Sequence, residues 1–179
     1  MPSPIVHAVA GYALSQFLPL EQPQSYRFRQ WKLPIFYSVF MAAAADLDFV
    51  PQLILGGDFH RGLSHSLFFT VVVSAIAAFF VSSWWKTSYQ KLLSCSVILY
   101  GSHLLLDYFS EGRGIKLFLP FVDGFYKAPI EIFPGLHYSK GLWDSSYIPT
   151  LIFEFVLCSI VLGGIWGWKK LQERQKFDT

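Results

Sequence analysis

Apolar residues run in long stretches along the chain, separated by shorter polar segments. Five of these stretches have the length that a membrane-spanning helix needs, about 17–25 residues: 4–20, 33–50, 66–85, 92–109 and 148–168. Ser3 suits the N-cap of the first helix and Pro4 its first turn, whereas Pro51 predicts the end of the second helix. The pattern therefore predicts an all-α protein, a polytopic membrane bundle of about five transmembrane helices.

Residues 110–147, between the last two stretches, have a different character. They are rich in glycine, proline and aromatic residues, so they are too interrupted to cross a bilayer. They are also too aromatic for a disordered linker, because such linkers lack the apolar side chains that form a core. We expect an extended, aromatic-rich flap that is folded against the membrane face, within a single membrane-embedded domain that spans residues 1–179.

The composition supports a membrane protein. Hydrophobic residues make up 53% of the 179 residues and charged residues 15%, whereas a soluble domain carries about 25% charged residues. So few charges cannot cover a surface that faces water, and lipid must cover much of it. The net charge of +2 argues against binding to nucleic acid, which depends on many basic contacts with phosphates.

Five crossings place the two termini on opposite sides of the membrane. The loops on the side of the C-terminus then hold most of the 14 Lys and Arg residues. Because short cytoplasmic loops are enriched in Lys and Arg, this side is predicted to be cytoplasmic. The other side is predicted to be extracytoplasmic.

Histidines and aspartates recur at the extracytoplasmic ends of the predicted helices. Four segments that are distant in the sequence contribute them: His7, Asp46, Asp48, His60, His65, His103 and Asp107. Hydropathy alone does not require this agreement in depth. Ionisable residues in membrane spans are costly and usually functional, so the shared position predicts one polar site.

Local spacing indicates how each motif reaches this site. His103 and Asp107 are four residues apart and share a helix face. Asp46 and Asp48 are two apart, so the helix must fray before Pro51 for both to point inward. His60 and His65 are separated by a glycine, which predicts a turn, and Ser64 is a candidate cap for the helix that follows.

Imidazole and carboxylate together suit Zn²⁺, Mn²⁺ or Fe²⁺ better than Ca²⁺. Seven candidate ligands exceed the four that a tetrahedral ion uses, so the sequence predicts one or two divalent metal ions, with zinc preferred. Asp48 and Asp107 are candidate catalytic carboxylates, and Arg61 could grip a phosphate through its fork of N–H donors. Glu154 is a candidate supporting partner or further ligand, with a plain ion pair as the alternative.

Each residue alone has an ordinary structural interpretation. His7 could be a histidine at a helix end, Asp46 and Asp48 could be solvated loop acids, and His103 could hydrogen-bond a neighbouring helix. The joint pattern, rather than any single residue, favours the metal site.

These motifs resemble those of the YdjM-type family of inner-membrane-associated metal-dependent hydrolases, which is described in part as LexA-binding. The resemblance is carried by His7, the Asp46-Leu47-Asp48 pair, the block from His60 to Ser66, and His103 with Asp107. It implies a multi-pass protein of the bacterial inner (plasma) membrane. A more distant similarity to zinc-dependent phospholipase C and single-strand nucleases suggests zinc and a phosphoester substrate. That similarity is at the level of fold.

The sequence therefore favours a membrane-embedded hydrolase of the phosphoesterase or phospholipase type. We expect a metal-activated water to cleave a phosphoester in a membrane lipid or lipid-linked phosphate. The alternative is a non-enzymatic metal-binding membrane protein, such as a sensor, scaffold or transporter subunit. Transporters bind near the midplane, whereas these residues lie near one surface. Polar residues that merely link helices are the third possibility, and the oligomeric state is left open.

Overall fold

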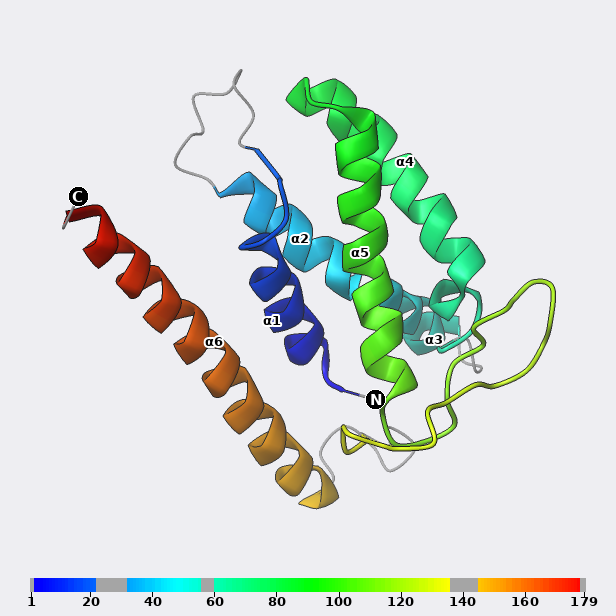
Figure 1. Ribbon diagram of the computed structural model, residues 1–179. Helices are drawn as coiled ribbons and strands as arrows, with labels where there is room; N and C mark the ends of the chain where they lie inside the picture. Colours follow the sequence, from blue (N-terminus) through cyan, green and yellow to red (C-terminus); the bar gives the residue numbers. More distant parts are fainter. Residues whose placement is uncertain (1, 22–31, 56–59, 136–144, 178–179) are drawn as a thin grey trace.

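The computed structural model of the protein describes residues 2–21, 32–55, 60–135 and 145–177. These residues form an all-α structure, as the sequence predicts, with no strand among them (Figure 1). The helices are α1 (Pro4–Ser15), α2 (Leu33–Ala43), η1 (Ala44–Asp48), α3 (Phe49–Leu55), η2 (Leu63–His65), α4 (Leu67–Trp85), α5 (Tyr89–Tyr108), η4 (Ser145–Tyr147) and α6 (Ile148–Phe177).

Helix α5 lies at the centre of the bundle. It packs against α4, α2 and α1, and the main buried cluster includes its Leu99, Tyr100 and Leu104. Helix α1 packs against α2 on one side and α6 on the other, so that α6 runs along the outside of the bundle (Figure 1). This arrangement brings the C-terminal end of α5 close to the start of α1.

Within the described parts of the chain, three helices are long and apolar enough to cross a membrane: Leu33–Gln52, Leu67–Trp85 and Ser145–Gln175. They correspond to the second, third and fifth predicted spans. Helix α1 is apolar but shorter, and α5 has the length but carries polar residues such as Gln90, Lys91 and Asp107. The count of five crossings stays a prediction.

The outer faces of α4 and α6 are apolar and exposed. Only 17% of the most apolar stretch of α4 is buried inside the protein, and only 22% of that of α6. Phe79 and Phe80 on α4, and Phe155 and Trp166 on α6, are among the exposed side chains. A contiguous apolar surface of this kind is unfavourable in water, and lipid is the solvent that fits it.

The second predicted helix does not stop at Pro51. The chain tightens into the 3₁₀ turn η1 and then continues as α3 to Leu55. Pro51 lies in the first turn of α3, where a backbone N–H has no partner within the helix, so its missing donor costs nothing there. The fraying expected at Asp46 and Asp48 is confirmed, whereas the predicted stop is wrong.

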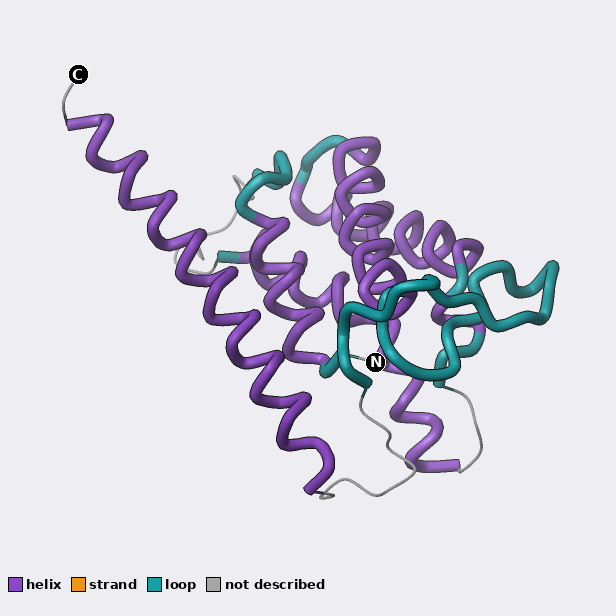
Figure 2. The backbone as a smooth tube through the Cα atoms, turned by 60° about the horizontal axis from the view of Figure 1, so that its bottom comes forward, coloured by secondary structure: helices purple, strands orange, loops and turns teal. Residues whose placement is uncertain are grey.

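The flap is folded in its described part, residues 110–135. It is an irregular loop that closes on itself through isolated bridges between Ser110 and Phe133 and between Ile115 and Tyr126 (Figure 2). Ile115 is fully buried in the main core cluster. The N–H of Leu67 donates to the carbonyl of Leu117 at 2.9 Å, which ties the flap to the start of α4.

Gly11 marks the closest approach of α1 to α2. A Cβ atom at this position would lie 2.6 Å from the backbone oxygen of Ser38 and 2.7 Å from the Cβ of Ala42. We therefore expect Gly11→Ala to force the helices apart and to destabilise the protein by about 1–3 kcal/mol. Thermal unfolding in detergent measures the effect. Gly101→Ala is the control, since a Cβ at Gly101 meets nothing within 4 Å, and equal losses for both variants would contradict this account of the packing.

Candidate metal centre

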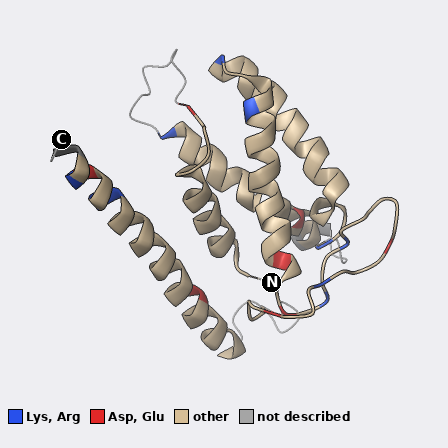
Figure 3. Cartoon of the chain, in the orientation of Figure 1, with Lys and Arg blue, Asp and Glu red and all other residues tan. Residues whose placement is uncertain are grey.

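The predicted site residues come together at one end of the bundle. Four parts of the chain deliver them: α1 carries His7, η1 carries Asp46 and Asp48, the turn through η2 carries His60, Arg61 and His65, and the last two turns of α5 carry His103 and Asp107. Acidic residues of η1 and α5 lie at the lower end of the bundle in Figure 3. We call His7, Asp46, His60, His65, His103 and Asp107 the His/Asp cluster.

The side chains at the centre of the cluster are fully buried and lie close together. The Nε2 atoms of His65 and His103 are 3.1 Å apart, and His65 Nε2 is 3.4 Å from Asp107 Oδ2. His7 stacks on His103 with ring centroids 3.7 Å apart, and its Nε2 lies 3.6 Å from Asp107 Oδ1. All four side chains are 0% exposed.

Several polar atoms of the cluster lack hydrogen-bond partners among the described residues. They are both carboxylate oxygens of Asp46, both of Asp107, and both ring nitrogens of His7. Each buried polar group left without a partner costs about 1–3 kcal/mol. Carboxylate oxygens and imidazole nitrogens that converge with so few hydrogen bonds form an arrangement that a cation stabilises.

The spacing of ligand atoms fits one or two divalent ions. His7, His103 and Asp107 each offer an atom within 4.8 Å of the others. Asp46, His60 and His65 do the same. The ring of His103 is already oriented for this purpose, because its Nδ1 bonds to the carbonyl oxygen of Ala42 at 2.9 Å and its Nε2 faces the centre. Three-ligand groups of imidazole and carboxylate leave a position open, as in catalytic zinc sites.

Asp48 contacts two of the candidate histidine ligands. Its carboxylate lies 2.7 Å from Nδ1 of His60 and 3.2 Å from Nδ1 of His65, and it accepts a hydrogen bond from the hydroxyl of Ser64. A carboxylate that binds Nδ1 fixes the ring and turns Nε2 toward an ion. The contacts therefore assign Asp48 to orienting two histidines, and its direct ligation stays a prediction.

Asp48→Asn should weaken metal binding by about 10–100-fold, the usual cost of losing a partner that orients a histidine ligand. Zinc titration of the purified protein with a competing chelator measures the change. Glu131→Gln serves as the control, because Glu131 pairs with the partly exposed Lys127 on the flap. An affinity equal to that of the wild type would show that Asp48 does not act through these rings.

Arg61 lies inside the site and is buried. It adopts a left-handed backbone conformation with φ of 64°, and its Nε is 3.8 Å from Asp107 Oδ2. Its terminal nitrogens donate to the hydroxyl of Ser110 at 3.1 Å and the carbonyl of Gly114 at 3.4 Å. The guanidinium is thus held at the edge of the cluster, between α5 and the flap.

The surroundings of His65 favour the protonated form of its imidazole ring. Burial disfavours its charged form, but the carboxylates of Asp107 and Asp48, at 3.4 Å and 3.2 Å from its ring nitrogens, outweigh burial and raise the pKa of His65 to about 9. A proton on this ring and a divalent ion near it satisfy the same carboxylates, so the two compete for the site.

Glu154 lies on α6 and outside the His/Asp cluster. Its buried carboxylate accepts a hydrogen bond from the backbone N–H of Ser3 at 2.7 Å, and Ser3 immediately precedes α1. Among the described residues, Glu154 has no ion pair or hydrogen bond with the cluster. This geometry fits the supporting role that the sequence left open, in which Glu154 fixes the start of the helix that carries His7.

The helix cap lies two residues beyond the candidate that the sequence suggested. Ser66, not Ser64, caps α4, since its hydroxyl accepts a hydrogen bond from the N–H of Phe69 at 3.1 Å. Ser64 instead binds Asp48, and its carbonyl accepts a hydrogen bond from the Tyr100 hydroxyl at 2.8 Å. Tyr100 was not predicted from the sequence, because an aromatic residue in an apolar helix gives no local signal of such a contact.

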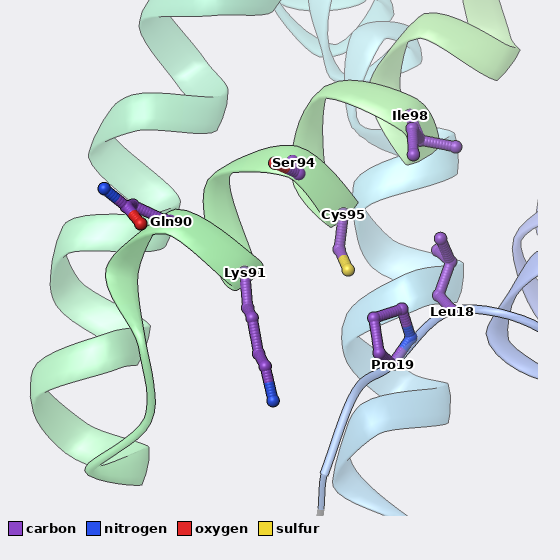
Figure 4. Close-up of a pocket in the computed structure, with 7 residues that line it drawn as sticks. All are labelled: Leu18, Pro19, Gln90, Lys91, Ser94, Cys95 and Ile98. Atoms are coloured by element: carbon purple, nitrogen blue, oxygen red, sulfur yellow. The ribbon is translucent and has the colours of Figure 1, made fainter.

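Another pocket lies far from the cluster, at the N-terminal end of α5 (Figure 4). Leu18, Pro19, Cys95 and Ile98 line it together with Lys91. Lys91 and Asp107 are separated by 16 positions on one helix, which corresponds to about 24 Å at 1.5 Å per residue. The pocket therefore belongs to the opposite end of the bundle.

Comparison with known proteins places the chain among inner membrane proteins. It is 24% identical over 146 residues to the inner membrane protein YbcI of Escherichia coli (strain K12), in an alignment that covers 76% of this chain and 84% of YbcI. No solved structure matches it. The YdjM inner membrane protein family matches residues 1–171, in agreement with the motifs and the candidate spans. The chain therefore belongs to the YdjM inner membrane protein family.

Proposed function

We propose that this protein is a membrane-embedded, metal-dependent hydrolase that cleaves a phosphoester in a lipid or lipid-linked substrate. The observation that supports the proposal most strongly is the convergence of buried imidazoles and carboxylates from four separate segments. His7, His103 and Asp107 form one group of candidate ligands, and Asp46, His60 and His65 form the second. Zinc fits this mixture of donors best, and manganese or iron fit it less well.

Bound divalent ions supply Lewis-acid activation of water and neutralise charge on the phosphoryl oxygens. In the hydrolysis, water adds to phosphorus, one P–O bond breaks, and the leaving group takes up a proton. Asp107 would offer one carboxylate oxygen to the ion and would accept the proton from water with the other, since neither oxygen has a hydrogen-bond partner among the described residues. Arg61, 3.8 Å from Asp107, binds a phosphoryl oxygen.

A lipid substrate is favoured by the apolar surface beside the cluster. Phe121 of the flap is 79% exposed and packs edge-on against Phe68 of α4, with ring centroids 5.9 Å apart. Phe118 and Leu67 are also exposed at this end. Aromatic side chains favour the membrane interface, so a lipid head group can reach the cluster without leaving the membrane surface.

The proposal is tested by incubating the purified protein with phospholipids and polyprenyl phosphates and following release of phosphate or head group. We expect turnover that stops when EDTA removes the metal and returns when zinc or manganese is added. A metal-loaded protein that cleaves none of these substrates would overturn the enzymatic proposal.

A second candidate is a metal-binding membrane protein without catalysis, such as a sensor or scaffold. The complete burial of His7, His65, His103 and Asp107 is the observation that favours it, because a substrate must reach an active centre. Retention of tightly bound metal together with no turnover would support this candidate. Turnover that depends on the metal would exclude it.

We also propose that the cluster faces the extracytoplasmic side. Lys86, Lys91, Lys169 and Lys170 lie at the opposite end of the bundle (Figure 3), where the positive-inside rule places the cytoplasm. A green fluorescent protein fused to the C-terminus should therefore fluoresce, since it folds in the cytoplasm. A dark fusion, with an active alkaline phosphatase fusion at the same position, would reverse the orientation.

A further inference from the structure

A second cavity adjoins the His/Asp cluster on the side of the flap. Its volume is about 200 Å³, and His60 lines it as well as belonging to the cluster. Three cationic side chains line the same cavity: Arg61, Arg113 and Lys116. We call this cavity the basic pocket. The pocket has room for a phosphoryl group and presents two cations, Arg113 and Lys116, that have no role in the proposed hydrolysis.

Two of the cations that line the pocket contact one aromatic ring, which lines the pocket as well. The Arg113 guanidinium lies 4.6 Å from the centroid of Phe125, and the Lys116 amine lies 5.1 Å from it. Arg113 also donates to the backbone carbonyl of His60 at 3.3 Å. Attraction between cations and the ring face stabilises this arrangement, which keeps two like charges side by side.

Two acidic side chains of the described residues lie beside cations of the pocket, Asp123 beside Lys116 and Asp107 beside Arg61. Lys116 pairs with Asp123 at 2.6 Å, but that carboxylate is 69% exposed. Exposed ion pairs contribute at most about 1 kcal/mol, so an anion in the pocket could displace Asp123 at little cost. Asp107, the acid near Arg61, faces the histidines of the cluster as well.

Arg61 connects the pocket to the cluster. Its guanidinium lines the pocket, while its Nε faces Asp107 at 3.8 Å. An anion in the pocket is therefore a neighbour of the group that the cluster would hold. The geometry calls for two adjacent anionic groups, one at the cluster and one in the pocket.

We propose that the basic pocket binds a phosphate group adjacent to the scissile one, so that the substrates are lipid diphosphates. This inference rests on the proposed hydrolase function and names its substrate class. Phospholipids with a choline head are disfavoured, since their quaternary ammonium would face Arg113 and Lys116. Diphosphates carry negative charge at both positions, and arginine binds phosphate oxygens through paired hydrogen bonds.

The test measures binding of inorganic pyrophosphate and of choline phosphate to the full chain by isothermal titration calorimetry, with EDTA present to remove metal ions. We expect pyrophosphate to bind more tightly than choline phosphate. Arg113→Gln and Lys116→Gln should each weaken pyrophosphate binding, and the double variant should weaken it tenfold or more. Lys127→Gln is the matched control, because Lys127 belongs to the flap, pairs with Glu131 and does not line the pocket.

A lipid arm separates a lipid source of the phosphate from a free one. Phosphatidylcholine nanodiscs that contain diacylglycerol pyrophosphate should compete with pyrophosphate, whereas nanodiscs of phosphatidylcholine alone should not. Equal competition by both would overturn the assignment to lipid diphosphates. Unchanged pyrophosphate binding in the double variant would overturn the pocket itself.

Failure of the basic-pocket proposal can be distinguished from failure of the hydrolase proposal. A metal-loaded protein that binds pyrophosphate through Arg113 and Lys116 but cleaves no lipid phosphate refutes the hydrolase and leaves the anion site standing. A protein that cleaves lipid phosphates equally well in the wild type and the double variant refutes the pocket and leaves the hydrolase standing.

Discussion

Replacing Asp107 by Asn should lower the rate of phosphoester hydrolysis by at least about 100-fold, the loss typical of removing a general base. Asp107 is the fully buried carboxylate of the cluster, and its oxygens lie 3.6 Å from His7 Nε2 and 3.4 Å from His65 Nε2. Asn keeps the shape and removes the negative charge and the basicity. The measurement is turnover on whichever lipid phosphate the wild type cleaves.

Glu21→Gln is the control for this variant. Glu21 is an exposed carboxylate that pairs with Lys91 at the far end of the bundle, so its neutralisation should leave turnover unchanged. Circular dichroism and membrane extraction establish that Asp107→Asn is inserted and folded. Wild-type turnover in folded Asp107→Asn would remove Asp107 from the chemistry.

The second large effect is expected for His65→Ala, which should reduce the affinity for zinc by more than about 100-fold. The reason is that a residue that binds the ion directly contributes more to metal affinity than a residue that only orients such a ligand. His65 Nε2 lies 3.1 Å from His103 Nε2 and 3.9 Å from Asp46 Oδ1, so that it joins the two groups of candidate ligands. Elemental analysis of the purified protein measures the metal per chain.

Gln90→Ala provides the comparison, since Gln90 is exposed on α5 at the end opposite to the cluster. It should retain the full metal content. If His65→Ala and Gln90→Ala carry the same metal as the wild type, His65 is not a ligand.

The sequence predicted the parts of the site that depend on local geometry. Asp46 and Asp48, two residues apart, required a break in the helix, and the 3₁₀ turn η1 provides it. Likewise, the glycine between His60 and His65 predicted a turn, and the structure has an irregular turn followed by η2. In both cases the spacing left few conformations in which both side chains face inward.

The parts that could not be predicted depend on contacts between distant segments. Asp48 meets the Nδ1 atoms of two histidines, and the choice between ligand and orienting partner depends on which ring nitrogen faces inward. The basic pocket forms because the flap folds back through the pairing of Ile115 with Tyr126. A turn that long-range contacts stabilise leaves no periodic pattern in the sequence. The cap at Ser66 in place of Ser64 reflects the one-to-two-residue uncertainty of helix ends.

The central claim is that side chains from four distant segments bind one cation site, and the zinc K-edge X-ray absorption spectrum of the zinc-loaded protein tests it most directly. We predict nitrogen and oxygen ligands at about 2.0–2.1 Å, with the outer scattering of at least two imidazole rings, and loss of an imidazole contribution in His65→Ala. A spectrum of hydrated zinc with oxygen ligands alone, unchanged in His65→Ala, would contradict the claim.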